Sequence, residues 1–370
     1  MERDELAGWL RLALTPEIGS ITARRLLASF GLPATLFAQD AEALAQVAGP
    51  AAAAVLGQEP EGLQAQVDAT LAWLQADPDH RQVLTLADPG YPASLLAIDD
   101  PPAMLYRMGR FDAAPPRALA IVGSRNATAQ GLQNARRFGR AFAEAGVTVV
   151  SGMALGIDGA AHEGALEGAA PDAIATIAVV GTGLDRVYPR QHRDLAHRIA
   201  DRGMLLSEYA IGTPPLPANF PRRNRLISGL SQGTLVVEAA LQSGSLITAR
   251  MAAEQGKEVF AIPGSIHSPH ARGCHALLRQ GAKLVESAQD VLEDLRYVLP
   301  ADAAAPGAVE DAAGEDPLLH AMGHDPVGLD ALIARTGIPA PRLQAQLLEL
   351  ELAGHVARLP GGLYQRIAQA

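Results

Sequence analysis

Six short apolar segments recur through the middle of the chain, and small or polar residues follow each of them. They occupy residues 118–122, 147–150, 177–180, 204–206, 234–237 and 259–262. Stretches compatible with helix separate them, the first from residue 128 to residue 145. Buried strands that alternate with helices predict an α/β fold in which a doubly wound, mostly parallel sheet carries helices on both faces. Because such sheets bind ligands at the carboxyl ends of their strands, we expect the functional site at that edge.

The pattern changes on the N-terminal side of this predicted sheet. Residues 1–80 are predicted to form a helical domain, in which residues 17–27 resemble a helix-hairpin-helix and residues 47–50 a second hairpin. Residues 81–116 contain short strands and proline-rich turns, which we interpret as the lead-in to the sheet. The sheet domain is therefore predicted to span residues 81–298.

The C-terminal side of the sheet is predicted to hold a linker and a small domain. Residues 299–317 are rich in alanine, proline, glycine and acidic residues, which predicts the linker. Apolar periodicity resumes in residues 318–370. The predicted helices are residues 329–336 and 341–352, and the predicted hairpin joins residues 356–359 to residues 363–365. This order of elements indicates a winged-helix domain. Its second helix offers Arg342 against Glu349 and Glu351, which favours protein contact or a structural role over DNA reading.

The net charge of −10 argues against a nucleic-acid partner, but the distribution of charge changes that conclusion. Residues 117–299 carry 19 Lys and Arg against 16 Asp and Glu, whereas residues 26–80 carry seven acidic side chains and no Lys or Arg. Because local fields govern association more than total charge does, a nucleic-acid-binding surface is plausible on the sheet domain. The acidic N-terminal helices are better suited to a structural role or to protein contact.

Two features of the sequence bear on the cellular compartment. No apolar run reaches 18 residues, and the N-terminus carries Glu2, Asp4 and Glu5 where a signal peptide is basic. We therefore expect a cytoplasmic protein without a membrane partner. The single cysteine, Cys274, excludes an intrachain disulfide and fits a reducing compartment.

The loop after the first predicted strand is the first candidate for anion binding. Gly123 and Ser124 form a tight turn between strand and helix, where free backbone N–H groups and the positive end of the helix dipole attract anions. Arg125 adds a planar guanidinium that matches phosphate geometry. The loop of a later strand offers small and polar residues of the same kind: Ser243, Gly244 and Ser245.

A basic and aromatic segment follows the fourth predicted strand. It contains Asn219, Phe220, Arg222, Arg223, Asn224 and Arg225. No acidic residue lies between Tyr209 and Val237, so the three arginines are not neutralised by sequence neighbours. Basic side chains that follow a phosphate backbone, beside an aromatic ring that stacks on a base, suit a single-stranded nucleic acid. The alternative is a solvated helix start with Phe220 in the core.

These motifs resemble those of the DNA-processing protein A family (DprA, also called Smf), the bacterial recombination mediators of natural transformation. The similar segments are residues 123–125, 151–158, 220–225, 227–229, 237–239, 243–249 and 263–265. The resemblance implies an extended Rossmann-like fold that binds single-stranded DNA and dimerises through this domain. It also implies that the protein loads RecA onto incoming strands protected by single-strand-binding protein.

The resemblance also implies roles for individual residues. Arg125 would grip a phosphate, with Gly123 and Ser124 shaping its turn, and Phe220 would stack on a base or wedge beside it. The three arginines that follow Phe220 would line the groove, except for one or two that brace the loop. The implied DNA-binding residues are Gly123, Ser124, Arg125, Asn219, Phe220, Arg222, Arg223, Asn224, Arg225, Ser243, Gly244 and Ser245. Some family members carry a basic residue just before the Asn-Phe step, where residues 216–218 of this chain are Leu-Pro-Ala, so one phosphate contact is expected to be missing.

An enzyme acting on nucleotides is the main alternative function. Residues 232–238 are similar to part of the Gly-Thr-x-x-Glu signature of phosphoribohydrolases, with one additional residue in the spacing. Asp158 and His162 have the i, i+4 spacing of an acid and a base, although helix capping and packing are the favoured roles for both.

Metal and cofactor sites are weaker alternatives. His267, His270, Cys274 and His275 have gaps that suit zinc, but the Pro and Gly between them equally suit a bent loop. Residues 123–125 lack the Gly-x-x-Gly continuation of a dinucleotide site, and no strand end carries a phosphate-cradling Gly-x-x-x-x-Gly-Lys loop. We therefore expect no catalysis, no cofactor and no bound metal.

Overall fold

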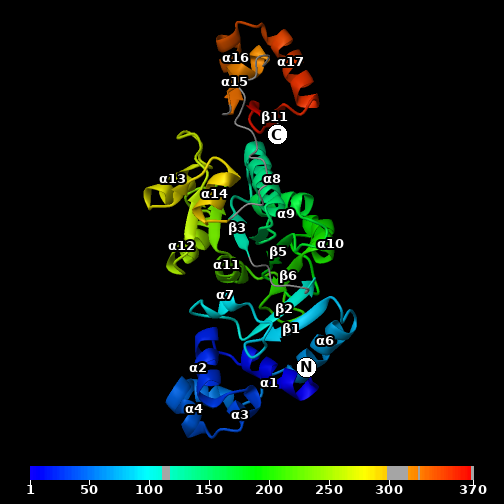
Figure 1. Ribbon diagram of the computed structural model, residues 1–370, viewed down its shortest axis with the longest axis vertical. Helices are drawn as coiled ribbons and strands as arrows, with labels where there is room; N and C mark the ends of the chain where they lie inside the picture. The colour runs from blue at the N-terminus through cyan, green and yellow to red at the C-terminus, as the bar shows by residue number, and fades with distance from the viewer. Residues whose placement is uncertain (111–116, 298–315, 324–325, 368–370) are drawn as a thin grey trace.

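The computed structural model describes residues 1–110, 117–297, 316–323 and 326–367, and its parts follow one another along a long axis (Figure 1). The N-terminal helices lie at one end of this axis. A large sheet with helices on both faces lies in the middle, and a small domain that contains the C-terminus lies at the other end. The site predicted from the sequence belongs to the middle part.

Within the described residues, nine strands form one mixed sheet in the order β1-β2-β6-β5-β4-β3-β7-β8-β9. They are β1 (Arg81–Thr85), β2 (Met104–Gly109), β3 (Ala118–Val122), β4 (Thr148–Ser151), β5 (Thr176–Val179), β6 (Met204–Ser207), β7 (Gly233–Val236), β8 (Glu258–Ala261) and β9 (Lys283–Leu284). Strands β3 to β9 are parallel, while β2 pairs antiparallel with β6 and with β1. Each of the six predicted strands is present with a shift of at most one residue, and the predicted fold class is confirmed.

The strand order creates a switch point between β3 and β7. From β3 the chain adds β4, β5 and β6 on one side, and it then crosses back to place β7, β8 and β9 on the other side. The connections that leave the carboxyl ends of β3 and β7 therefore diverge in opposite directions. Such divergence opens a crevice in which open α/β sheets bind their ligands.

Helices cover both faces of the sheet (Figure 1). One face carries α8 (Ala129–Glu144), α9 (Ile157–Gly168), α10 (Arg193–Arg202) and α14 (Ala288–Asp294), and the other carries α7 (Ala93–Leu96), α11 (Asn219–Leu230), α12 (Ser245–Glu254) and α13 (Arg272–Arg279). Alternate side chains of a strand point to opposite faces. In β3, Leu119 and Ile121 belong to the core beneath α8 and α9, whereas Ala120 and Val122 belong to the core beneath α11 and α12.

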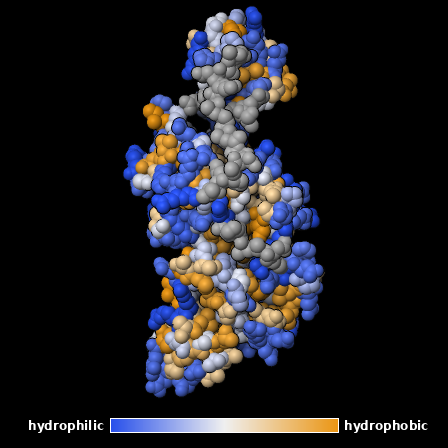
Figure 2. All heavy atoms as spheres, viewed as in Figure 1, coloured by the Kyte–Doolittle hydropathy of each residue, from blue (hydrophilic) through white to orange (hydrophobic). Residues whose placement is uncertain are grey.

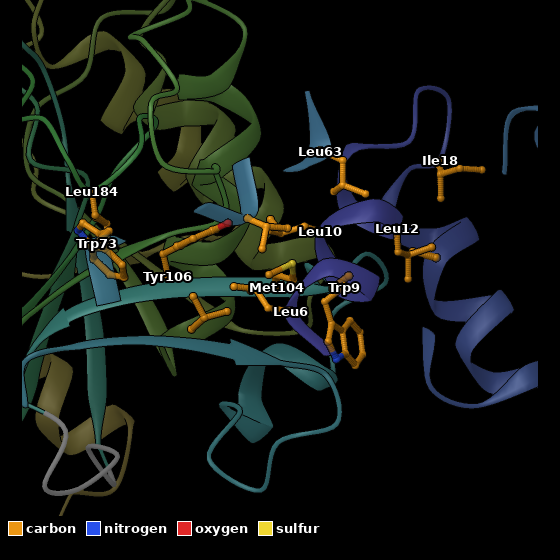
Figure 3. Packing of buried hydrophobic residues seen from close by; sticks show 14 of the residues in the cluster. Leu6, Trp9, Leu10, Leu12, Ile18, Leu63, Trp73, Met104, Tyr106 and Leu184 are labelled. Carbon is orange, nitrogen blue, oxygen red and sulfur yellow. The ribbon is translucent and has the colours of Figure 1, made fainter. Parts of the chain in front are cut away.

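Six helices precede the sheet and share a core with its edge. They are α1 (Arg3–Leu14), α2 (Ser20–Phe30), α3 (Pro33–Phe37), α4 (Ala41–Ala48), α5 (Pro50–Leu56) and α6 (Leu63–Gln75). Leu6, Trp9 and Leu10 of α1 belong to the same buried cluster as Met104 and Tyr106 of β2 (Figure 3). Because this core continues from the helices into β2, the domain boundary at residue 80 stays a prediction.

Both predicted N-terminal hairpins lie between consecutive helices. Residues 15–19 join α1 to α2, and Gly49 joins α4 to α5 with a φ of 88°, a region that favours glycine. Figure 2 shows apolar side chains gathered over this end of the molecule, where Ile21 and Leu32 are 56% and 53% exposed. None of the helices in the described ranges is both long and apolar enough to cross a bilayer.

The C-terminal domain is a winged helix, as the sequence predicts. Its elements are α15 (Pro317–Met322), β10 (Val327–Gly328), α16 (Leu329–Thr336), α17 (Ala340–Leu352), β11 (Val356–Leu359) and β12 (Leu363–Arg366). The strands form an antiparallel sheet in the order β10-β12-β11. Leu332, Leu343 and Leu347 are fully buried in its own small core. Most of the predicted linker at residues 299–317 lies outside the described residues.

Candidate nucleic-acid interface

A cleft of about 430 Å³ lies at the switch point between β3 and β7, and we call it the switch cleft. The connection after β3, the N-terminal half of α11 and the start of α12 line it. Nine of the twelve predicted DNA-binding residues line this cleft: Gly123, Ser124, Arg125, Phe220, Arg223, Asn224, Ser243, Gly244 and Ser245. Asn219, Arg222 and Arg225 do not. The fold thus brings three sequence-distant segments to one place.

Helical periodicity decides which residues of the basic segment reach the cleft. Phe220, Arg223, Asn224 and Ile227 recur at i, i+3, i+4 and i+7 of α11 and therefore share one face, which lines the switch cleft. Arg222, the residue before Arg223, points from another face of α11. It lines small cavities beside α1 instead. The three arginines that are adjacent in sequence consequently have different surroundings.

Arg125 is exposed at the mouth of the switch cleft and is available to an anion. Its side chain has no hydrogen-bond or ion-pair partner among the described residues, and its guanidinium carbon lies 5.7 Å from the ring centroid of Phe220. Phe220 is half-buried, and its ring also packs on Tyr188 with centroids 5.3 Å apart. A cation beside two partly exposed rings is an arrangement that accommodates both a phosphate and a stacked base.

Three backbone N–H groups of the β3 loop, in contrast, are already occupied. Ser124 N–H donates to the carbonyl of Glu238 at 2.8 Å, and Asn126 N–H donates to Ser124 Oγ at 3.2 Å. Thr128 N–H donates to the Glu238 carboxylate at 2.9 Å. The expectation that free N–H groups of this turn bind the anion is therefore wrong for these three groups. The carboxylate of Glu238 already sits at the positive end of α8, where it stabilises the helix dipole.

Arg223 supplies a fixed positive charge at the base of the switch cleft. Its side chain is 4% exposed, and its guanidinium donates to the carbonyl of Val179. Burial lowers the pKa of Arg223 to about 10, while the neighbouring Asp158 opposes the shift, so the group remains charged at neutral pH. A Cβ at position 152 would overlap the guanidinium, which explains why Gly152 occurs there. The Nε of Arg223 has no hydrogen-bond partner among the described residues.

The start of α12 completes the positive surroundings of the switch cleft. Ser243 and Ser245 face the cleft and their hydroxyl oxygens lie 2.7 Å apart. The first turn of α12 carries no acidic residue, and its N-cap residue, Gly244, has no side chain to cap it; Ser243 Oγ accepts from Ser245 N–H at 3.4 Å. This helix end therefore differs from that of α8, because its dipole is not compensated by a carboxylate.

Arg225 has ion-pair partners that suit the bracing role, which the resemblance allows for one or two of the three arginines. It is 5% exposed, its Nε lies 2.7 Å from Asp100 Oδ2, and its Nη2 lies 2.7 Å from Glu208 Oε2. Burial raises the pKa of Glu208, and the charge of Arg225 acts in the opposite direction. Nε and Nη2 are both engaged, so Arg225 braces α11 against the neighbouring loops, and it does not line the switch cleft.

Asn219 also braces α11. Its side-chain nitrogen is buried and donates to the carbonyl of Gly181 at 3.0 Å, and its own carbonyl accepts from the Tyr209 hydroxyl at 3.1 Å. These bonds fix the first turn of the helix to the loops after β5 and β6. The neighbouring Phe220 is thereby held at the mouth of the switch cleft.

The residues considered for catalysis have structural partners. His162 is fully buried with its Nδ1 2.7 Å from Thr176 Oγ1, and it does not line the switch cleft, although Asp158 does. Cys274 is buried and its thiol donates toward the carbonyls of Val236 and Val237 at 3.7 and 3.8 Å. In the parts of the chain that the structure describes, no group of three His, Cys, Asp or Glu side chains is arranged to hold a metal.

The burial of His162 predicts a pH-dependent stability. Burial lowers the pKa of His162 from 6.5 to about 3, so between these values the unfolded chain binds a proton that the folded chain excludes. The free energy of unfolding should therefore decrease as the pH falls below about 6.5, by up to about 1.4 kcal/mol per pH unit for this one group. Chemical denaturation of the protein and of His162→Gln across this range measures the difference.

Only the difference between those two proteins isolates His162. Burial raises the pKa of Asp158 and of Glu208, and these groups contribute the opposite dependence in both proteins. If the free energy of unfolding depends on pH in the same way for the two proteins, the lowered pKa of His162 is contradicted. Folded His162 would then take up a proton at its ordinary pKa.

Sequence reasoning missed one functional candidate, Tyr188. It is 45% exposed and lies against Phe220 at the edge of the switch cleft. The sequence around it, Arg186-Val187-Tyr188-Pro189-Arg190, interleaves an aromatic residue with arginines. The same signal led to the segment around Phe220, so it was sufficient to find Tyr188 as well.

Sequence comparisons find relatives over most of the chain. The family described as DNA recombination-mediator protein A matches residues 82–296, and the DprA winged helix domain matches residues 301–362. Protein Smf of Escherichia coli is 44% identical over 312 residues, which cover 82% of each chain. Protein Smf of Synechocystis is 34% identical and covers 99% of this chain and 100% of its own length.

Solved structures agree with these matches. The X-ray structure of DNA processing protein A from Streptococcus pneumoniae aligns with a TM-score of 0.65 and 36% identity, covering 80% of this chain and 98% of that one. DNA processing protein A from Helicobacter pylori aligns with a TM-score of 0.52 and 32% identity, covering 58% of this chain and 96% of that one. The Helicobacter pylori structure gives insight into the single-stranded DNA binding mode of that protein.

Proposed function

The chain belongs to the DNA recombination-mediator protein A family, and on that premise we propose that it binds single-stranded DNA in the switch cleft. The observation that carries this proposal is the placement of Arg125, Phe220 and Arg223 around one opening at the carboxyl edge of the sheet. Arg125 binds a phosphate, Arg223 holds a positive charge behind it, and Phe220 stacks on a base. The single-stranded DNA binding of the Helicobacter pylori protein supports the same class of ligand.

The same premise extends to the partners of the protein. We propose that it acts in the cytoplasm as a mediator that loads RecA onto single strands covered by single-strand-binding protein, during natural transformation. The proposed homodimer forms through the Rossmann-like domain. These parts of the proposal rest on the family membership, whereas the DNA site also rests on the geometry of the switch cleft.

We further propose that the switch cleft binds and does not catalyse. A phosphoribohydrolase requires a free acid, but the Glu238 carboxylate accepts hydrogen bonds from Thr128 and lies against Gly131. His162 is fully buried and does not line the switch cleft. Neither group is placed to transfer a proton to a ligand in the cleft.

Fluorescence anisotropy with labelled single-stranded and duplex DNA, titrated across a salt series, tests the proposed function. We expect preferential binding of single strands and an affinity that falls steeply with salt, because phosphate contacts release counterions. Absence of DNA binding together with hydrolysis of a nucleoside monophosphate would support the phosphoribohydrolase alternative.

Arg125→Ala should weaken binding to single strands of every sequence and flatten the salt dependence. Loss of one phosphate contact should change the slope of log affinity against log salt by about 0.7. Arg137→Ala is the matched control, since Arg137 is an exposed arginine of α8 that lines neither this cleft nor the one described below. Equal slopes for the two variants would mean that the β3 loop has only a structural role.

A further inference from the structure

A second and larger cleft, of about 1160 Å³, is lined by Val187 and Arg190, the sequence neighbours of Tyr188. The end of α6, strands β1 and β2, the loop after β5, and α10 with the short helix before it, η1 (Arg190–His192), line it. We call it the second cleft. Its walls come from the N-terminal helices and from the Rossmann-like domain, so it forms only where the two pack together.

Tyr188 lies next to lining residues of both clefts. Its ring packs on Phe220, which lines the switch cleft, and its sequence neighbours Val187 and Arg190 line the second cleft. Strands β3 and β5 are separated by β4, a step of about 10 Å at the usual strand spacing. The two rings lie 5.3 Å apart and present adjacent aromatic surface.

The second cleft offers cations without partners beside this aromatic pair. Arg190 and Arg193 are exposed, and neither side chain has a hydrogen-bond or ion-pair partner among the described residues. Their spacing of three places them close together at the start of α10. Two further cations, Arg186 and Arg81, also line this cleft.

Two of the three acidic groups that line the second cleft have hydrogen-bond partners. Asp185 accepts from Gly212 N–H at 2.8 Å and from Arg186 at 2.9 Å, and Asp77 pairs with His80 at 3.0 Å. Asp201, near the end of α10, is the remaining carboxylate of the lining. The end of the cleft next to Tyr188 is therefore positive.

We propose that a single strand held in the switch cleft continues over Tyr188 into the second cleft, where Arg190 and Arg193 contact its phosphates. Tyr188 stacks on a base next to the one on Phe220, since both rings are partly exposed and adjacent. This inference rests on the proposed function, because it extends the same DNA site. It assigns to the loop after β5 and to the start of α10 a role in holding a longer stretch of DNA.

Substitutions of Tyr188 test the stacking. Tyr188→Leu keeps an apolar contact with Phe220 but removes the aromatic face, and it should weaken binding to a single strand of about 16 nucleotides by about 5- to 150-fold without changing the salt slope. Tyr188→Phe should retain the affinity of the unchanged protein. A melting temperature measured for each variant separates loss of stacking from loss of folding. Equal affinities for the unchanged protein and a folded Tyr188→Leu variant would overturn the proposal.

Strand length tests the second cleft itself. Arg190→Ala with Arg193→Ala should lower the salt slope by about 1.4 on a strand of about 16 nucleotides and leave binding to one of about 4 nucleotides unchanged. Arg137→Ala with Arg250→Ala, two exposed arginines outside both clefts, is the matched control. A slope that does not respond to the Arg190 and Arg193 changes would overturn the proposal.

Arg125→Ala measured in the same series distinguishes the two possible failures. If Arg125→Ala weakens binding while the Tyr188, Arg190 and Arg193 variants do not, the DNA site ends at the switch cleft and the proposed function stands. If the unchanged protein does not bind single strands at all, the proposed function fails together with its extension.

Discussion

Replacing Phe220 by alanine should weaken binding to single-stranded DNA by about 5- to 150-fold, because one stacked base contributes roughly 1 to 3 kcal/mol. The salt slope should change little, since no charge is removed. One side of the ring approaches Gly181, where a Cβ would come within 3.1 Å of it, and the other surroundings are Tyr188 and Arg125. The ring is thus supported from behind and remains partly open to a base.

Affinity and melting temperature measured together test this role. Full burial of the ring would instead make Phe220→Ala cost about 3 to 5 kcal/mol of folding stability. A large loss of stability with unchanged DNA affinity would therefore contradict stacking. Phe220→Trp keeps an aromatic face and should retain binding, whereas Phe220→Leu, which keeps only apolar bulk, should not.

Replacing Arg225 by alanine should lower the free energy of unfolding by about 3 to 5 kcal/mol, the usual cost of leaving a buried charge without its partner. The side chains of Arg225 and Glu208 are both 6% exposed, so little water can compensate the stranded carboxylate. Denaturant unfolding monitored by circular dichroism measures the effect. The exposed pair of Arg198 and Glu163 provides the control, because Arg198→Ala should cost at most about 1 kcal/mol.

The double variant Arg225→Met with Glu208→Leu should recover most of the lost stability, since apolar side chains of similar size often replace a buried ion pair without cost. Arg225→Ala could instead keep the free energy of unfolding of the unchanged protein and lose DNA affinity. The ion pair would then contribute little to stability. Arg225 would in that case belong with the DNA-contacting residues after all.

The strands and the location of the candidate site were predictable because they depend on local pattern. Each apolar segment, such as residues 118–122, is followed by small or polar residues. Parallel strands place their carboxyl ends, and therefore these residues, at one edge of the sheet. The helix-turn-helix and hairpin of the C-terminal domain follow from equally local signals. Neither inference requires knowledge of distant partners.

The roles of the individual arginines were not predictable in this way. Arg222, Arg223 and Arg225 look equivalent in sequence, but a helix turns by about 100° per residue and sends them to different surroundings. The acidic partner Asp100 is 125 residues away from Arg225 in sequence. Sequence periodicity could have separated Arg223 from the other two, but only the tertiary structure shows which face of α11 meets the cleft.

The carboxylate of Glu238 at the start of α8 also affects which molecules compete for the carboxyl edge of the sheet. In dinucleotide-binding proteins of related topology, the pyrophosphate of the cofactor occupies the helix N-terminus that follows the first strand. Here the protein places its own anion at that position, with hydrogen bonds to Thr128 and close contact to Gly131. A free nucleotide therefore finds the usual diphosphate position taken. We therefore expect free nucleotides to bind weakly at the carboxyl edge of the sheet. A polymer that binds through several successive phosphates and bases does not depend on the diphosphate position at the start of α8.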